Sequence, residues 1–204
     1  MVAVIQPIGS GSIAEAARVV RSGGLLVYPT DTVYGLGCDP FNEDAVGRLF
    51  RAKGRGSKAV PVLCGSEAKA SELVSLNKVA LELARAHWPG PLTIVAPLKA
   101  KVPTGLAQGT GRLGVRVPGL ARCVELIDAC GGWLVGTSAN VSGSPSSKTA
   151  KEAFDQLGES VDLILDGGDL LGTESTVVQV EGETVTILRT GPIGVGSQVK
   201  GRRT

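Results

Sequence analysis

Short apolar runs alternate with segments of helical periodicity along most of this chain, and this alternation constrains the fold more than any other feature. The apolar run 25–28 ends at Pro29 and is typical of a buried strand. Before it, residues 12–23 place apolar side chains on one helical face and stop at two glycines. Strands and helices that follow one another in this way build α/β proteins. We therefore expect a mixed, largely covered sheet between helix layers.

The same pattern predicts the other elements. Further strands are expected at 60–64, 91–96, 113–117, 133–135, 161–165, 175–180 and 184–188, the last two as a hairpin. Further helices are expected at 42–52, 66–76, 77–87, 120–130 and 149–157, and residues 99–111 are expected to be irregular. Ser66 and Asn77 are predicted helix caps, and Ser12 with Glu15 is a predicted capping box in the first helix.

Composition narrows the class of protein. The 204 residues are predicted to form one domain over 1–194, followed by a flexible basic tail over 195–204. A net charge of only +2 means that any bound anion must be held by a few placed residues. The chain shows no signal peptide and no apolar run near the ~18 residues of a membrane span, so we expect a cytoplasmic location. The four cysteines lack C-x-x-C spacing and are expected to be small buried thiols.

Polar residues follow the strand at 25–28. Thr30, Asp31 and Thr32 stand there, ahead of Gly35 and Gly37. Hydroxyls, a carboxylate and bare backbone at the carboxyl end of a strand are suited to a small polar ligand. The alternative is that Asp31 and Thr32 only cap a turn, and these residues alone leave both interpretations open.

Three cations, Lys53, Arg55 and Lys58, follow the second predicted helix. Arginine forks onto phosphate oxygens while lysine acts as a point charge, so the group fits a polyanion. The alternative is that cations at the end of a helix only complement its dipole. That alternative explains Lys53 better than it explains Arg55 and Lys58.

Hydroxyl and amide side chains are concentrated at 137–143, where Thr137, Ser138, Asn140 and Ser142 follow a predicted buried strand. The backbone N–H groups and hydroxyls of such a loop can form an anion-binding nest. The chain has no P-loop and no nucleophile elbow. Its single histidine, His87, ends a predicted helix beside Trp88 and is expected to pack rather than to catalyse.

Arg116 lies between apolar residues in a predicted strand. A buried guanidinium must be paired, so Arg116 either meets a carboxylate of the protein or awaits the carboxylate of a ligand.

Taken together, these motifs resemble the YrdC-like family of threonylcarbamoyl-adenylate synthases, in its short, single-domain form. The resemblance covers the chain from about residue 14 to residue 193. It rests on motifs in the same order, at 28–37, 53–55, 88–93, 116–118, 137–143, 166–168, 174–178 and 189–191. The fold that the resemblance implies is a twisted, open, mixed β-sheet with helices on both faces and a central, positively charged cavity.

The resemblance also implies a nucleotidyltransferase reaction, in which L-threonine, bicarbonate and ATP give threonylcarbamoyl-AMP and pyrophosphate. The product supplies the tRNA threonylcarbamoyl-transfer machinery, which modifies adenosine next to the anticodon. The implied nucleotide-binding residues are Lys53, Arg55, Lys58, Ser138, Asn140, Ser142 and Arg189, with Lys53 and Arg55 also catalytic. The implied threonine-binding residues are Thr32, Arg116, Thr137 and Ser175. Mg²⁺ is expected with the ATP, because no clustered carboxylates indicate a metal cage in the protein.

Other functions stay open at this point. Where many members of the family have a histidine after the strand at 60–64, this chain reads Cys64-Gly65-Ser66. A related protein could therefore adenylate or transfer a different carbamate. The chain could also bind RNA or a nucleotide without turnover, and the basic tail could contact tRNA weakly.

Overall fold

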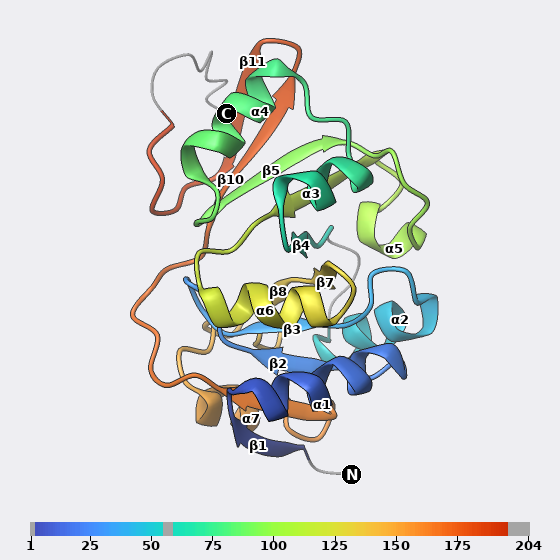
Figure 1. Ribbon diagram of the computed structural model, residues 1–204, viewed down its shortest axis with the longest axis vertical. Coiled ribbons are helices and arrows are strands. Elements are labelled where there is room, and N and C mark those ends of the chain that lie inside the picture. Colours follow the sequence, from blue (N-terminus) through green and yellow to red (C-terminus); the bar gives the residue numbers. More distant parts are fainter. Residues whose placement is uncertain (1–2, 55–58, 196–204) are drawn as a thin grey trace.

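Two mixed β-sheets organise the protein, as the computed structural model in Figure 1 shows for the residues that the structure describes, 3–54 and 59–195. The mixed α/β class predicted from the sequence is confirmed. The strands form two sheets rather than the single sheet expected from the sequence.

Sheet A has the order β1-β9-β2-β3-β8. Its strands are β1 (Val4–Pro7), β9 (Leu163–Asp166), β2 (Leu26–Tyr28), β3 (Gly35–Gly37) and β8 (Thr137–Ser138). Strand β9 pairs in parallel with β1 and β2, whereas β3 pairs antiparallel with both β2 and β8. Strand β3 thus lies between β2 and β8. The polar residues after β2 and the hydroxyl residues of β8 therefore lie near each other in this sheet.

Sheet B has the order β11-β10-β5-β6-β4-β7. Its strands are β11 (Thr184–Arg189), β10 (Thr176–Glu181), β5 (Leu92–Pro97), β6 (Arg112–Arg116), β4 (Val62–Cys64) and β7 (Trp133–Val135). The predicted hairpin of β10 and β11 is confirmed as an antiparallel pair. Strand β10 pairs in parallel with β5, and β4 with β6, so this sheet is mixed as well.

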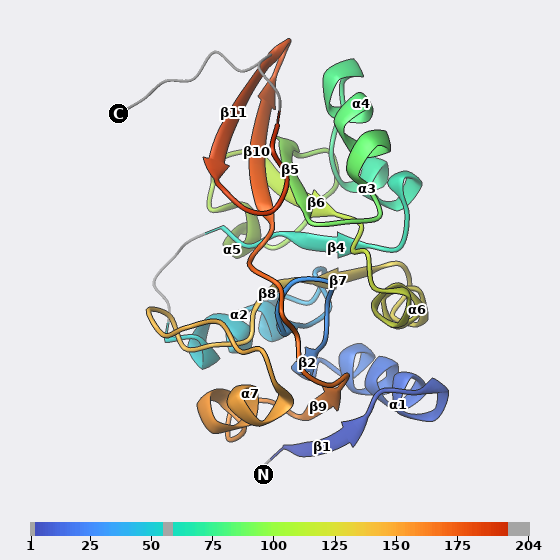
Figure 2. The ribbon, with the colours of Figure 1, turned by 90° about the vertical axis from the view of Figure 1, so that its left-hand side faces the viewer.

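The helices cover both faces of sheet A but leave one face of sheet B open to a cavity. Helix α1 (Ser10–Arg21) packs against β2 and β9 of sheet A and against α6 (Ala121–Ala129), which contacts β4 and β7 of sheet B. Helix α7 (Ala150–Leu157) packs against β2 and β9. Helices α3 (Glu67–Leu73) and α4 (Lys78–His87) cover one face of sheet B, as Figure 2 shows. Helix α2 (Glu43–Ala52) and the short α5 (Thr104–Ala107) complete the described helices.

Helix caps follow the sequence closely. The side chains of Asn42, Ser66, Asn77 and Thr149 each accept a hydrogen bond from a backbone N–H in the first turn of α2, α3, α4 and α7. The capping box predicted for Ser12 and Glu15 is wrong. Helix α1 begins two residues earlier with Gly9 as its N-cap, and the Ser12 hydroxyl accepts from the backbone N–H of Gly9 at 2.9 Å.

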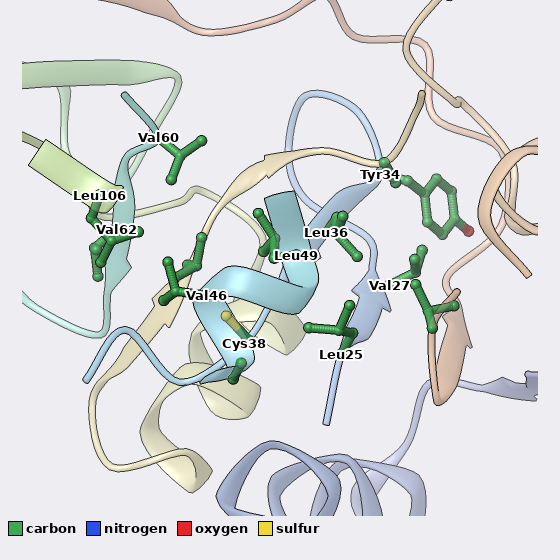
Figure 3. Packing of buried hydrophobic residues seen from close by; sticks show 14 of the residues in the cluster. Leu25, Val27, Tyr34, Leu36, Cys38, Val46, Leu49, Val60, Val62 and Leu106 are labelled. Carbon is green, nitrogen blue, oxygen red and sulfur yellow. The ribbon is translucent and has the colours of Figure 1, made fainter. Parts of the chain in front are cut away.

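The largest apolar cluster holds the two sheets together. Figure 3 shows Val46 and Leu49 of α2 in the middle of it, between Leu25 and Leu36 of the sheet A region and Val62 of β4. All of these side chains are buried. Because this cluster contains residues of both sheets and of α2, the sheets and α2 bury their apolar faces against one another.

Glycines let the chain pass from one sheet to the other. Gly136 joins β7 of sheet B to β8 of sheet A, and a Cβ there would overlap the side chain of Leu63. A Cβ at Gly37 would overlap the backbone oxygen of Val135. The two sheets therefore approach each other at a point where only bare backbone fits.

The cysteines behave as the sequence predicts. Cys38, Cys64 and Cys123 are buried and Cys130 is partly buried, all four as thiols without a disulfide. Burial raises the pKa of Cys38 and of Cys130 to about 12, so both stay protonated at neutral pH. None of the described helices is long and apolar enough to cross a membrane.

We expect Gly37→Ala to lower the free energy of unfolding by about 2 kcal/mol, because the added methyl group must displace the Val135 backbone. Gly11→Ala is the matched control, since nothing lies within 4 Å of its Cβ and alanine favours the helix. Chemical denaturation measures both. Equal effects of the two substitutions would contradict the close approach at Gly37.

Candidate active site

A cavity of about 440 Å³ lies between the two sheets. Sheet A contributes the ends of β2, β3 and β8, and sheet B contributes the open face of β5, β6 and β10. The polar residues that line it are Tyr28, Thr30, Thr32, Tyr34, Thr93, Thr110, Arg112, Arg116, Thr137, Ser138, Glu174, Ser175, Gln179 and Arg189. A cavity of this size and lining is suited to a small, partly polar ligand.

The alternation of side chains along sheet B explains which residues face the cavity. On β6, Arg112, Gly114 and Arg116 line it, while Leu113 and Val115 turn into the apolar core. Successive side chains of a strand point to opposite faces, so one strand supplies both core and cavity.

Arg116 is buried and held from three sides. Its Nε donates to the backbone oxygen of Gly90 at 2.9 Å, Nη1 to Thr32 Oγ1 at 3.2 Å and Nη2 to Asp31 Oδ1 at 2.5 Å. The side chains of Arg116 and Asp31 are only 5% and 16% exposed, so this ion pair is shielded from water. Since a guanidinium has five N–H donors, these bonds leave two donors of Arg116 for a ligand carboxylate. Of the two alternatives raised for Arg116, the protein carboxylate is present as Asp31, and the carboxylate of a ligand stays a prediction.

The segment after β2 supplies two of the hydrogen-bond acceptors of Arg116. The Thr30 hydroxyl accepts from the Thr32 N–H at 3.1 Å and donates to the Val33 oxygen at 2.7 Å, which closes the turn. Thr32 and Asp31 then both reach Arg116. The turn-capping alternative therefore describes Thr30, whereas Thr32 and Asp31 form part of the buried site.

Ser175 lies on the other side of the cavity. Its hydroxyl lies 2.9 Å from that of Thr93 and accepts from Arg189 Nη2 at 3.0 Å. Arg189 also pairs with the Glu174 carboxylate, whose second oxygen accepts from Ser146 Oγ at 2.7 Å. Ser175 is thus a buried hydroxyl in a fixed position at the cavity wall.

The backbone nest predicted for the loop at 137–143 is not formed. Four successive N–H groups of the loop donate to acceptors of the protein itself: Ala139 to Tyr34 O at 2.8 Å, Asn140 to Ser138 O at 3.0 Å, Val141 to Gln156 Oε1 at 3.0 Å and Ser142 to Lys53 O at 2.9 Å. The pairing of β8 with β3 and of the loop with its neighbours uses these donors. An anion at this loop would therefore need side-chain donors. The Ser138 hydroxyl lines the cavity but donates to Asn140 Oδ1 at 2.6 Å, so it would have to turn away from Asn140 to donate to an anion.

Lys53 reaches this loop rather than the cavity wall. It follows the last residue of α2, but its side chain is buried, and Nζ donates to the backbone oxygens of Ser138 at 2.5 Å and Asn140 at 2.9 Å. The interpretation of Lys53 as a cation that merely complements the helix dipole does not account for this burial.

Tyr34 is a cavity residue that the sequence did not single out. Its hydroxyl donates to Gly168 O at 2.8 Å and accepts from the Gly167 N–H at 3.0 Å, and it lies 3.1 Å from Asp166 Oδ1. Burial raises the pKa of Tyr34 to about 12, so it is a neutral hydrogen-bonding group at physiological pH. It fixes the turn at 166–168 against β3.

Comparison with known proteins identifies the family. The Sua5/YciO/YrdC family model, described as telomere recombination, matches residues 18–191. The chain belongs to the Sua5/YciO/YrdC family. A Halorhodospira halophila relative named threonylcarbamoyl-AMP synthase is 38% identical over 157 residues, which cover 76% of this chain and 82% of that protein.

Solved structures of the Sua5/YciO/YrdC family have the same fold. The structure of Pyrococcus abyssi Sua5 complexed with L-threonine matches with a TM-score of 0.90 at 32% identity, over 98% of this chain and 62% of that one. Escherichia coli YciO matches with a TM-score of 0.87 at 28% identity, over 96% of this chain and 98% of that one. The family and the fold predicted from the sequence motifs are therefore confirmed.

The structure brings most of the predicted site residues of this Sua5/YciO/YrdC member to the cavity. Those that line it are Thr32, Arg116, Thr137, Ser138, Ser175 and Arg189. Asn140 is buried within the loop and Ser142 is exposed, and neither is among the lining residues. Arg55 and Lys58 lie outside the described residues, so their predicted roles stay predictions.

Other lining residues were missed as site residues although some stood in the motifs. Thr30, Thr93 and Glu174 belong to quoted motifs, and their hydroxyl and carboxylate groups were the available signal. Gln179 and Arg112 gave no signal beyond the alternation of their strands.

The described arginines that line the cavity are each compensated by a carboxylate. Among the described lining residues, Arg116, Arg112 and Arg189 each pair with a carboxylate, that of Asp31, Glu181 and Glu174 respectively. The predicted positive charge of the cavity stays a prediction, because it also depends on Arg55 and Lys58.

Removing the partner of Arg116 tests the buried ion pair. We expect Asp31→Ala to lower the free energy of unfolding by about 3 kcal/mol, because it leaves a buried guanidinium without a counter-charge. Glu125→Ala is the control. It breaks the exposed pair with Arg122, where we expect a loss of less than about 1 kcal/mol. Similar losses in urea denaturation would show that the Asp31 pair contributes no more than a surface pair.

Proposed function

We propose that this member of the Sua5/YciO/YrdC family is an L-threonylcarbamoyl-adenylate synthase, which forms threonylcarbamoyl-AMP and pyrophosphate from L-threonine, bicarbonate and ATP. One observation carries the proposal: a single cavity joins a buried arginine with spare donors to a hydroxyl-bearing loop. Arg116 and Ser138, from different sheets, both line it. An amino acid and a phosphate chain can therefore be held side by side.

The relatives support this proposal. The Halorhodospira halophila protein carries the name threonylcarbamoyl-AMP synthase, and the Pyrococcus abyssi Sua5 structure contains L-threonine. Both resemble this chain over most of its length.

In the proposed reaction, the amine nitrogen of threonine bonds to the carbon of bicarbonate-derived CO₂ and loses a proton, giving a carbamate. A carbamate oxygen then attacks the α-phosphorus of ATP, and the bond to the bridging oxygen breaks as pyrophosphate leaves. The two remaining donors of Arg116 would hold the threonine carboxylate, with Thr32, Thr137 and Ser175 around it. Fixed positions and the exclusion of water would supply most of the acceleration.

The phosphates would lie toward Ser138 and its loop. Arg55, Lys58 and Arg189 are proposed to offset the charge on the leaving pyrophosphate. The described residues contain no group of three or more histidine, cysteine or acidic side chains that could hold a metal ion. We propose that Mg²⁺ enters with ATP as its counter-ion, and that the product passes to the tRNA threonylcarbamoyl-transfer machinery in the cytoplasm.

Pyrophosphate release tests the proposed reaction. We expect release only when ATP, bicarbonate and L-threonine are all present, and a product with the mass of threonylcarbamoyl-AMP. L-Serine and L-valine are the informative replacements for threonine, since each lacks one side-chain feature. Release that is independent of threonine, or that prefers another amino acid, would contradict the proposed substrate.

Ser175→Ala tests the wall of the amino-acid site. Loss of one buried hydroxyl should raise the KM for threonine about fivefold and change kcat little, because it removes a hydrogen bond worth about 1 kcal/mol. Ser75→Ala, at an exposed serine away from the cavity, is the control. A fall in kcat at unchanged KM would place Ser175 in the chemical step instead.

A further inference from the structure

Three oxygens of one loop lie within hydrogen-bonding distance of the Lys53 ammonium group. Nζ lies 2.5 Å from Ser138 O, 2.9 Å from Asn140 O and 3.2 Å from Asn140 Oδ1. An ammonium has three N–H donors, and these acceptors match that number. The side chain is 2% exposed, so water cannot replace them.

The same loop is bonded to Lys53 through its backbone and is stiffened from within. Ser142 N–H donates to Lys53 O at 2.9 Å, and the Ser138 hydroxyl donates to Asn140 Oδ1 at 2.6 Å. The amide nitrogen of Asn140 donates to Val141 O at 3.0 Å and to Ser144 O at 2.7 Å. Oxygens of two residues converge here, and a buried cation is what makes such a convergence stable.

Of the three hydrogen-bonded residues Lys53, Ser138 and Asn140, only Ser138 reaches the cavity. Ser138 lines the cavity, whereas Lys53 and Asn140 are not among its lining residues. A substrate phosphate would therefore meet the loop that Lys53 holds.

We propose that Lys53 is a positioning residue, which sets the place of Ser138 in the cavity through Ser138 O and Asn140 and does not itself bind phosphate. This inference rests on the proposed function, since it presumes that a nucleotide occupies the cavity. It separates Lys53 from Arg55 and Lys58, which the sequence motif groups with it.

Calorimetric titration with ATP, ADP and AMP separates positioning from direct contact. If Lys53 acts through the loop, Lys53→Met should weaken all three nucleotides by a similar factor of about tenfold or more, because the same displaced loop meets each of them. The double variant Lys53→Met with Asn140→Ala should bind no more weakly than the weaker single variant. Direct contact instead predicts a loss that grows from AMP to ATP and adds to that of Asn140→Ala.

Two further variants sharpen the result. Lys53→Arg keeps the charge but cannot fit a guanidinium into the space of the ammonium, so it should be as weak as Lys53→Met; rescue by arginine would overturn the proposal. Lys151→Met, at an exposed lysine of α7 paired with Asp155, should bind as the wild type does. Absence of nucleotide binding by the wild type would refute the proposed function itself, whereas graded, additive losses would refute only the positioning role.

A measurement on the unsubstituted protein keeps the test decisive if Lys53→Met does not fold. Buried, hydrogen-bonded ammonium protons exchange slowly, so ¹H–¹⁵N spectra should show the Lys53 ammonium without nucleotide. Its signal should move little, and equally, on addition of AMP, ADP or ATP. A signal that appears only with nucleotide, or a shift that grows with the number of phosphates, would overturn the proposal.

Discussion

The close crossing of the two sheets at bare backbone is the constraint on which the rest of the structure depends. Gly136 carries the chain from β7 to β8 against Leu63, and Gly37 of β3 lies against the backbone of Val135. A side chain at either position would push the sheets apart. Because they meet here, Ser138 at the edge of sheet A and Arg116 in sheet B face one cavity. The site is therefore a consequence of how the sheets are joined.

Two buried cations, Arg116 in the cavity wall and Lys53 beneath the loop at 137–143, are compensated in the same way. Arg116 and Lys53 are each buried, and each gives most of its donors to oxygens of the protein. Such compensation is what makes a buried cation tolerable. The two cations differ in the donors that remain. Arg116 has two N–H donors left for a ligand, whereas the three N–H donors of the Lys53 ammonium are matched by three oxygens of Ser138 and Asn140.

The sequence predicted the elements that apolar patterning and caps define. Strand β2 ends near Pro29, and α2 begins after Asn42, as expected from apolar runs and capping chemistry. It could not predict β3 and β8. Strand β3 has three residues, two of them glycines, and β8 has only two hydroxyl residues, so neither shows an apolar alternation. For the same reason the division into two sheets was not visible. Residue type did reveal Arg116 and Ser138, but the Asp31 partner and the oxygens around Lys53 depend on contacts between distant segments.

Specificity in this cavity follows from the cost of leaving buried groups unpaired. The two remaining donors of Arg116 are shielded from water, as is the Ser175 hydroxyl, so a ligand without a carboxylate would leave the guanidinium incompletely bonded. Such a deficit discriminates far more strongly than a missing methyl group in an apolar wall. The apolar lining, which includes Val33, Leu63 and Val177, can distinguish side chains only weakly by comparison. With Arg116 binding the α-carboxylate as proposed, the cavity would discriminate against ligands without a carboxylate more strongly than between two side chains.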